Sequence, residues 1–474
     1  MTLFGAILVG LTYWQVIRAD ELVYGPYNPR LAEESSRVTR GRILDRTGGV
    51  LAESQPGPSG MQRRYTEPSA AQVIGYYSQK HGESGLESAF TRYLRGDVQA
   101  GAADTLVDQM LHRPRNGADL LLTLDPKVQT AAARALGANK GAAVALDPHT
   151  GAVLAMGSVP YYDPNRLEEQ WSDLQNDPNR PLYNRAAQGL YTPGSVFKIV
   201  TATAAIDLGL VDLDKKYTCT DDLVVDGFRI QNKNHPGIST VTFVDDFAYS
   251  CNVTFAKTGL GLDTKPLPVG DDLPNPPPWI RSIDESRRRF VDYAHRFGLE
   301  ASIPFDLPTS TSKIGMQPLS RVELANTAFG QGELQVSPLL MALATATIAN
   351  SGVMPEPYLV QEIRDHDGRV LQRHTPRTIR QVMSADTARA MNRLMVTSVR
   401  EGYAKPAQID GIDVGGKTGS AEVGPGQATH SWFIGYAPAD NPKVAVAVIM
   451  ENRGPGSDFA TPAGRIILQA AVGR

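Results

Sequence analysis

Cysteine is scarce in this sequence, and so are closely spaced metal ligands. Its 474 residues include two cysteines, Cys219 and Cys251, too few for a disulfide-built scaffold or a thiolate metal site. We expect two unpaired thiols, although pairing in an oxidising compartment stays open. No His-x-x-x-His or Glu-x-x-His spacing is present either. The sequence therefore predicts neither a metal nor a cofactor.

An excess of positive charge is also missing. Lysine and arginine together number 47 against 50 aspartates and glutamates, which gives a formal net charge of −3. The one dense basic run, Arg287–Arg289, is explained most simply as a solvated surface. We therefore expect no nucleic-acid partner.

The first residues of the chain lack charge and are mostly apolar up to Arg18. Their number reaches the short end of what a membrane-spanning helix needs, and Tyr13 and Trp14 suit a membrane interface. The basic leader and small-residue cleavage site of a signal peptide are not evident. The pattern predicts an uncleaved transmembrane anchor over residues 1–18, with a cleaved signal or a buried helix as alternatives.

Secondary-structure signals divide the rest of the chain into two parts. Residues 19–120 have weak periodicity apart from a hairpin pattern around Asp45–Gly49, and we expect a small irregular module. Residues 121–474 begin with two strand-like runs and end with three, with mostly helical segments between them. This order predicts an α+β domain, in which helices flank a five-stranded antiparallel sheet beside an all-helical lobe. The seam between sheet and lobe is a natural substrate cleft.

Ser195 opens an apolar helical pattern after Pro193 and Gly194 break the preceding segment. Lys198 follows three residues later, on the same face of the expected helix. A buried lysine with a lowered pKa can take the proton of a serine hydroxyl, which is otherwise a poor nucleophile. The pair is sufficient for acyl transfer, but a helix cap followed by a surface lysine has the same spacing.

The Ser-x-x-Lys spacing recurs at Ser310 and Lys313 in a different context. Proline, threonine and serine surround this copy, and no apolar helix follows to bury the lysine. We interpret it as a loop without a chemical role.

Ser250 and Asn252 stand just before a further apolar run. Alone, they are ordinary helix caps. Together with Ser195 they offer a second hydroxyl that relays a proton and an amide that orients a lysine or a substrate amide.

Lys417, Thr418 and Gly419 lie on a strand-like segment near the end of the chain. Glycines there let a substrate backbone approach, and a strand edge can bind an extended peptide by main-chain hydrogen bonds. The backbone N–H of Ser420 can join that of Ser195 in an oxyanion hole. This segment is therefore a candidate substrate-binding strand.

A second Lys-Thr-Gly triplet, Lys257–Gly259, lies inside the apolar run that Ser250 and Asn252 precede. Lysine near a helix C-terminus and glycine just beyond it are common stop signals. We predict that this triplet ends a helix and has no catalytic role.

Ser-x-x-Lys, Ser-x-Asn and Lys-Thr-Gly occur in this order in β-lactamases and penicillin-binding proteins. With these motifs the chain resembles the class B penicillin-binding proteins, the transpeptidases of bacterial cell-wall synthesis, over nearly its whole length. The resemblance implies the penicillin-binding fold and a pedestal or dimerisation-like module ahead of the transpeptidase domain. Further segments that resemble this family are Arg40–Ala52, Gly82–Glu87, Gly141–Asn165, Gly330–Ala342 and His430–Ala439.

The resemblance also implies roles for the motif residues and a reaction. Ser195 would attack the D-Ala-D-Ala bond of a peptidoglycan stem peptide, release D-alanine and pass the acyl group to a neighbouring amine. Penicillins and other β-lactams would acylate the same serine. The implied catalytic residues are Ser195, Lys198, Ser250, Asn252 and Lys417, and the implied substrate-binding residues are Thr418, Gly419 and Ser420.

By resemblance, one helix would anchor the protein in the bacterial cytoplasmic membrane, with the catalytic domain on the outer face. A polytopic glycan polymerase of the SEDS type would be its partner. Three alternatives stay open: a D,D-carboxypeptidase that uses water as acceptor, a β-lactam-hydrolysing or β-lactam-sensing protein of the same fold, and a non-catalytic scaffold of a cell-wall complex. A scaffold would be free to lose Ser195 and Lys198, and both are present.

Overall fold

The computed structural model describes most of the chain and divides it into two compact units. The smaller unit comprises Met1–Leu122, Asp163–Trp171 and Val360–Arg373, and the larger comprises Thr123–Tyr162, Ser172–Leu359 and His374–Arg474. The smaller unit thus takes in two segments from beyond residue 120, where the sequence placed the boundary of the first module. The described residues are 10–11, 13–14, 18, 38–57, 60–98, 115–232, 240–262 and 283–473.

The predicted anchor over residues 1–18 lies largely outside the described residues. Within the described part of the chain, no helix combines the length and the apolar character needed to cross a membrane. The anchor therefore stays a prediction from the sequence.

The smaller unit is built on a six-stranded sheet, which corrects the expectation of an irregular module. Its strand pairs are antiparallel except β2 with β8, which run parallel. The central pairs of the sheet, β16 with β8 and β8 with β2, join segments far apart in the chain, so local patterns do not reveal the whole sheet. The strand order is β17 (Val370–Arg373), β16 (Val360–Arg364), β8 (Asp119–Leu122), β2 (Ile43–Leu44), β3 (Val50–Gly57) and β4 (Gly60–Tyr65).

The hairpin predicted around Asp45–Gly49 is confirmed, since this turn joins β2 to β3. Asp45 Oδ1 accepts hydrogen bonds from the backbone N–H of Thr47 at 2.7 Å and of Gly49 at 2.9 Å. A side chain that closes its own turn in this way is typical of aspartate. Gly48 takes φ = 89°, a left-handed value that glycine adopts without steric cost.

The larger unit contains an antiparallel sheet made of two early and three late strands. The α+β class and the five antiparallel strands expected from the two ends of this part of the chain are confirmed, and the smaller unit adds a six-stranded sheet that was not expected. Within the larger unit, β19 forms one edge of the sheet. The order is β10 (Val153–Val159), β9 (Gly141–Leu146), β21 (Val444–Met450), β20 (His430–Ala437) and β19 (Gly415–Ala421).

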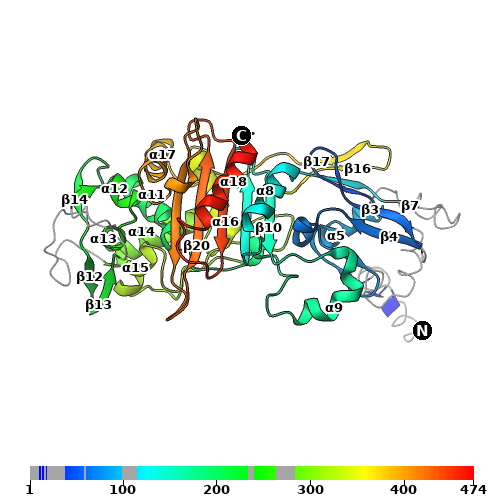
Figure 1. Ribbon diagram of the computed structural model, residues 1–474, viewed down its shortest axis with the longest axis horizontal. Coiled ribbons are helices and arrows are strands. Elements are labelled where there is room, and N and C mark those ends of the chain that lie inside the picture. Colours follow the sequence, from blue (N-terminus) through cyan, green and yellow to red (C-terminus); the bar gives the residue numbers. More distant parts are fainter. Residues whose placement is uncertain are drawn as a thin grey trace. The chain divides into compact units, whose positions relative to one another are not determined.

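Helices cover this sheet. α8 (Pro126–Leu136) and α18 (Ala460–Val472) lie side by side over it (Figure 1) and share a hydrophobic cluster with its strands. α16 (Pro338–Ala349), nearly all of whose residues are buried, packs on β9, β20 and β21. Every residue of β21 is buried, as its unbroken apolar sequence predicts.

The lobe beside this sheet is not all-helical, which corrects that prediction. β11 (Lys216–Thr218) pairs with β14 (Thr240–Thr242), and β12 (Asp222–Val225) pairs with β13 (Phe228–Gln231). Strands this short leave no room for an alternating pattern to stand out in the sequence. The β12–β13 hairpin lines the site described next.

Candidate active site

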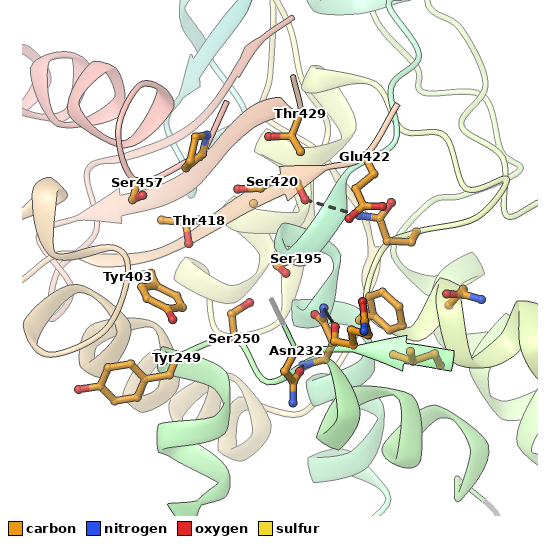
Figure 2. Close-up of a pocket in the computed structure, with 18 of the residues that line it drawn as sticks. Ser195, Asn232, Tyr249, Ser250, Tyr403, Thr418, Ser420, Glu422, Thr429 and Ser457 are labelled. Atoms are coloured by element: carbon orange, nitrogen blue, oxygen red, sulfur yellow. Dashed lines mark hydrogen bonds between the residues drawn. The ribbon is translucent and has the colours of Figure 1, made fainter. Parts of the chain in front are cut away.

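Ser195 lies in the wall of a pocket of about 650 Å³ in the larger unit (Figure 2). It belongs to a 3-10 turn, η4 (Gly194–Phe197), that leads directly into α11 (Lys198–Asp207). This is the helix start that the sequence predicts. Ser195 Oγ has no hydrogen-bond partner among the described residues, so its hydroxyl is available to a substrate in the pocket.

Two glycines let the segment of Ser195 approach strand β19 closely. A Cβ atom on Gly194 would lie 2.9 Å from backbone atoms of Ser420, and one on Gly419 would lie 2.9 Å from the carbonyl oxygen of Pro193. Real Cβ contacts are rarely so short, and backbone cannot move aside cheaply. Glycine at both positions therefore lets Ser195 and the strand edge lie close together.

Lys198 begins α11, and its side chain is fully buried. Its Nζ donates hydrogen bonds to Ser250 O at 2.7 Å, Ser250 Oγ at 3.0 Å and Asn252 Oδ1 at 2.8 Å. Burial lowers the pKa of Lys198 well below its ordinary value, the charge of Lys417 lowers it further, and Asp246 acts in the opposite direction. A lysine whose neutral form is populated near neutral pH can accept a proton from serine.

Ser250 Oγ lies between two buried lysines. It is 3.0 Å from Lys198 Nζ and 3.1 Å from Lys417 Nζ, and burial lowers the pKa of Lys417 to about 7. Two ammonium groups on one oxygen would repel each other, so one neutral amine beside one ammonium is the favoured charge state. The hydroxyl can then donate a proton to the amine and accept one from the ammonium, which makes it a proton relay.

The backbone of Ser250 is held in an uncommon conformation. Its φ is 62°, in the left-handed region that residues other than glycine seldom occupy. Asn232 Oδ1 accepts hydrogen bonds from the N–H groups of Asn252 at 2.6 Å and Val253 at 3.3 Å. Because such strain persists only where the surroundings impose it, Asn232 is a positioning residue for this motif.

A disulfide joins Cys251, the middle residue of the Ser-x-Asn motif, to Cys219. This overturns the expectation of unpaired thiols. The two cysteines are 32 residues apart in the chain, and only the path through β12, β13 and β14 brings them together in the buried interior. The bond ties the segment after β11 to the turn that carries Ser250.

Replacing both cysteines by serine is expected to lower the free energy of unfolding of the larger unit by about 3 kcal/mol, because the closed loop no longer restrains the unfolded chain. Penicillin acylation should also slow, since Ser250 loses one of its restraints. Denaturant titration and acylation kinetics measure the two effects. An unfolding midpoint equal to that of the wild type would contradict the structural role of the bond.

Lys417 and Thr418 lie on β19, where Lys417 pairs with Ile434 and Thr418 with Phe433 of β20. Lys417 is fully buried beneath the pocket, and its Nζ contacts Ser250 Oγ. Thr418, Gly419 and Ser420 line the pocket itself (Figure 2). As the edge strand of the sheet, β19 can receive an extended peptide on its free side.

Both repeated motifs have structural explanations. Ser310 and Lys313 lie in a loop, and Lys313 is exposed. The backbone of Lys313 forms an isolated antiparallel β-bridge with Gln335. The loop interpretation is therefore confirmed. Lys257 is in the last turn of α13 (Asn252–Leu260), as predicted. Gly259 does not end that helix, since Gly261 caps it.

The reason for glycine at position 259 is close packing. A Cβ atom there would lie 2.4 Å from that of Ala328, at the end of α15 (Arg321–Ala328). Gly259 thus allows α13 and α15 to pack closely, and the positions of residues along the chain do not predict this role.

Lys417→Ala is expected to slow penicillin acylation about 10²-fold. The variant loses the hydrogen bond from Lys417 Nζ to Ser250 Oγ and the positive charge beneath the substrate-binding strand β19. Lys257→Ala is the matched control from the second triplet, and its acylation rate should stay within a factor of about two, as for surface changes away from the site. Stopped-flow acylation compares the two variants. Equal slowing in both would refute the distinction between the triplets.

The acylation rate is expected to rise with pH and to level off well below the ordinary lysine pKa, because the predicted base is the neutral form of Lys198, whose pKa is lowered. Lys417 of β19 lowers the pKa of Lys198 and Asp246 of α12 (Phe243–Ala248) raises it. Lys417→Met removes the positive neighbour, so the inflection should move to higher pH. A pH profile of second-order acylation rates tests this, and an inflection that stays fixed or moves lower would contradict the pairing.

Several residues in or near the pocket carried no signal in the sequence. Tyr249 and Tyr403 meet edge to face with ring centroids 6.0 Å apart, and both line the pocket beside Asn232. Asp246 is fully buried, and burial raises its pKa to about 7. Tyr249 directly precedes Ser250 in the chain, which was the available hint; the others come from segments whose proximity depends on the fold.

Two family models match the chain. The penicillin-binding protein transpeptidase domain matches residues 141–469, and the penicillin-binding protein A dimerisation domain matches residues 40–120. The peptidoglycan D,D-transpeptidase PbpA of Mycolicibacterium smegmatis is 33% identical over 100% of this chain and 97% of the relative. PbpA of Mycobacterium tuberculosis is 32% identical over the same shares.

Solved structures give the same result. The ceftriaxone acyl-enzyme of penicillin-binding protein A from M. tuberculosis superposes with a TM-score of 0.82 at 30% identity, over 93% of this chain and 99% of that chain. The D,D-transpeptidase domain of a peptidoglycan glycosyltransferase from Eggerthella lenta superposes with a TM-score of 0.80 at 30% identity, over 92% and 99%.

Proposed function

The chain belongs to the penicillin-binding protein transpeptidase family, and from this premise we propose that Ser195 is the residue acylated during peptidoglycan crosslinking. The protein is a serine-type D,D-transpeptidase that forms acyl-enzymes with β-lactams. Its chemistry therefore consists of acylation by a donor stem peptide and deacylation by an acceptor amine.

In acylation, Ser195 Oγ attacks the carbonyl carbon between the two terminal D-alanines as neutral Lys198 takes its proton. The C–N bond breaks, and the leaving D-alanine amine takes up a proton delivered from Lys198 through Ser250. In deacylation, an amine of a neighbouring stem attacks the ester, gives up a proton along the same path, and restores the Ser195 hydroxyl. The acyl group ends on the new amide bond.

Substrate binding would rest chiefly on β19. Thr418 would bind the terminal carboxylate of the donor, with the charge of Lys417 just beneath. The donor peptide would lie along the strand edge, and Gly419 leaves room for its backbone. The N–H groups of Ser195 and Ser420 would receive the oxyanion, where removing a donor costs about 10²–10³ in rate.

The observation that carries this proposal is the convergence of two fully buried lysines on Ser250 Oγ, at 3.0 and 3.1 Å, beneath a pocket lined by Ser195. Burying two amines is unfavourable for stability alone, since each prefers water when charged. Pairs of groups with displaced pKa values are typical of acid-base sites.

Mass spectrometry after exposure to penicillin G tests the assignment. The intact protein should gain one covalent adduct, and peptide mapping should place it on the peptide that contains Ser195. An adduct on another serine would overturn the role of Ser195. Rapid loss of the adduct would favour β-lactam hydrolysis instead.

A crosslinking assay with lipid-linked glycan strands and an added glycan polymerase separates transfer from hydrolysis. Crosslinked muropeptides are expected; free D-alanine without crosslinks would favour a D,D-carboxypeptidase. We further propose a bacterial cytoplasmic-membrane location through residues 1–18 and a SEDS-type polymerase partner. The apolar character of those residues and the family membership support this proposal.

A further inference from the structure

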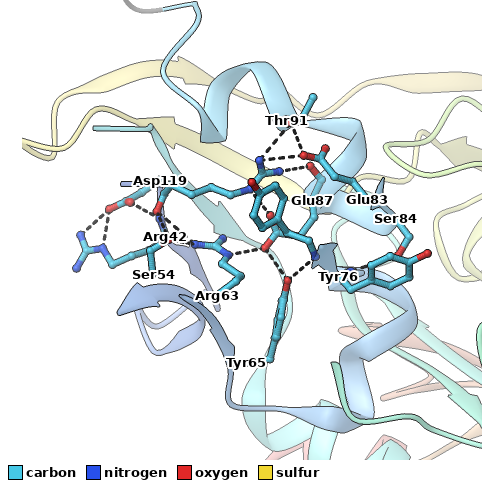
Figure 3. A network of polar contacts seen from close by, with 12 residues as sticks. Arg42, Ser54, Arg63, Tyr65, Tyr76, Glu83, Ser84, Glu87, Thr91 and Asp119 are labelled. Carbon is cyan, nitrogen blue, oxygen red and sulfur yellow. Dashed lines mark hydrogen bonds and ion pairs between the residues drawn. The ribbon is translucent and has the colours of Figure 1, made fainter. Parts of the chain in front are cut away.

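A group of buried charges in the smaller unit has no part in the transpeptidase chemistry (Figure 3). Glu87, which is fully buried, accepts one hydrogen bond from Arg40 Nε and another from Arg63 Nε, each at 2.6 Å. Burial by itself raises the pKa of Glu87, but the two guanidinium groups outweigh burial and lower it. Glu87 is therefore an anion shared between two buried cations.

Arg63 keeps a donor that no described residue satisfies. Its side chain is 2% exposed, and Nη1 donates to Arg40 O at 3.3 Å and to Ser54 Oγ at 3.4 Å. Nη2 is buried without a hydrogen-bond partner. Arg95 Nε is also buried without one, because the carboxylate paired with it, on Asp97, is 3.6 Å away. A buried cationic donor without an acceptor lowers the stability of the fold, so a bound group that accepts its hydrogen bond is expected.

Arg63 and Arg95 line the same small cavity. Its volume of about 20 Å³ suits one group of water size or slightly larger. Among the described residues, three guanidinium groups line the cavity and no carboxylate does. The other lining residues are Arg40, Ser54, Met61, Tyr77 and Gln79.

We propose that this cavity binds one small monoanion, a halide ion or a single carboxylate group, at Arg63 Nη2 and Arg95 Nε. Guanidinium groups bind carboxylates through charge-assisted hydrogen bonds. The nearby carboxylates of Glu83, Glu87 and Asp97 are each paired with an arginine already. An anion at these donors would make charge-assisted hydrogen bonds, which are stronger than those that a water molecule makes.

Chloride NMR line width and thermal melting of the full chain test the site. Bound chloride should broaden the chloride signal, and acetate should reverse the broadening by competition. Chloride or acetate should raise the melting temperature by about 2 °C or more over gluconate at equal sodium concentration, because a ligand of the folded state stabilises it. Gluconate is the control, because the hydroxyl-bearing carbon next to its carboxylate is bulkier than the unbranched carbon of acetate or of a glutamate side chain.

Two variants leave the Arg40–Glu87–Arg63 bonds intact. Arg95→Gln removes one cation, and Gln79→Glu places a competing carboxylate at the cavity wall. Both should lose the chloride broadening and the anion-dependent melting shift. Arg64→Gln, an exposed arginine on β4 next to Arg63, is the matched control and should retain both.

A blocked peptide with one glutamate distinguishes the source of the carboxylate. If it displaces chloride as acetate does, the cavity accepts a carboxylate presented by another chain; if acetate alone displaces chloride, the site takes free ions. Both results support the site. Absence of chloride broadening in the wild type, or broadening unchanged in Arg95→Gln and Gln79→Glu, would overturn it.

Discussion

Ser195→Ala is expected to gain no penicillin adduct at any exposure time. The hydroxyl of Ser195 is the proposed attacking group, has no hydrogen-bond partner among the described residues, and faces the pocket (Figure 2). Alanine removes the reacting oxygen but is otherwise the same size, so the fold should persist. Intact-mass analysis with a far-ultraviolet circular dichroism spectrum measures adduct and fold together.

Ser310→Ala is the matched control, because it alters the other Ser-x-x-Lys motif of the chain. That serine lies in a loop, does not line the pocket, and precedes an exposed lysine. Its variant should be acylated at the wild-type rate. A stable adduct on Ser195→Ala, or loss of the adduct in Ser310→Ala, would show that the wrong copy of the motif was assigned.

Lys198→Met is expected to slow acylation by about 10²–10⁴-fold, the usual contribution of a positioned general base. Methionine fills the buried space of the lysine, so the loss should come from chemistry and not from a cavity. Ser195 would keep its place but lose the group that accepts its proton. Single-turnover acylation with a fluorescent penicillin measures the rate.

The corresponding control is Lys313→Met, which changes the exposed lysine of the loop motif. Its rate should match that of the wild type. Methionine at position 198 also leaves Asn252 Oδ1 and Ser250 O without their donor, so thermal melting accompanies the kinetics. A Lys198→Met enzyme that acylates within a factor of about ten of the wild type falls outside the range for a general base, and Lys198 would not be the base.

The order of the three motifs and their local contexts were readable from the sequence. Periodic apolar residues after Ser195 predicted the helix that buries Lys198, and the glycine-rich run around Lys417 predicted the strand that became β19. These signals are local, because helix and strand periods express themselves within a few residues. The same reasoning separated Ser195 from Ser310, since only one of the two precedes an apolar helix.

The disulfide and the lobe strands could not be predicted in this way. Cys219 and Cys251 are brought together by a chain path through short strands, and spacing alone does not encode that path. The six-stranded sheet escaped prediction for the same reason, as β16 and β17 reach it from residues 360–373. Strand pairing is a long-range property, and a strand's partner leaves no mark in its own sequence.

The sequence by itself determined which residue types were available for acyl transfer, in which order, and on which helix or strand each would lie. The tertiary structure decided how they meet. Ser250 Oγ stands between Lys198 and Lys417 because three segments converge, and each lysine has a lowered pKa because that convergence excludes water. Desolvation and like-charge repulsion depend on distances in space, so the chemistry of these lysines is a property of the fold.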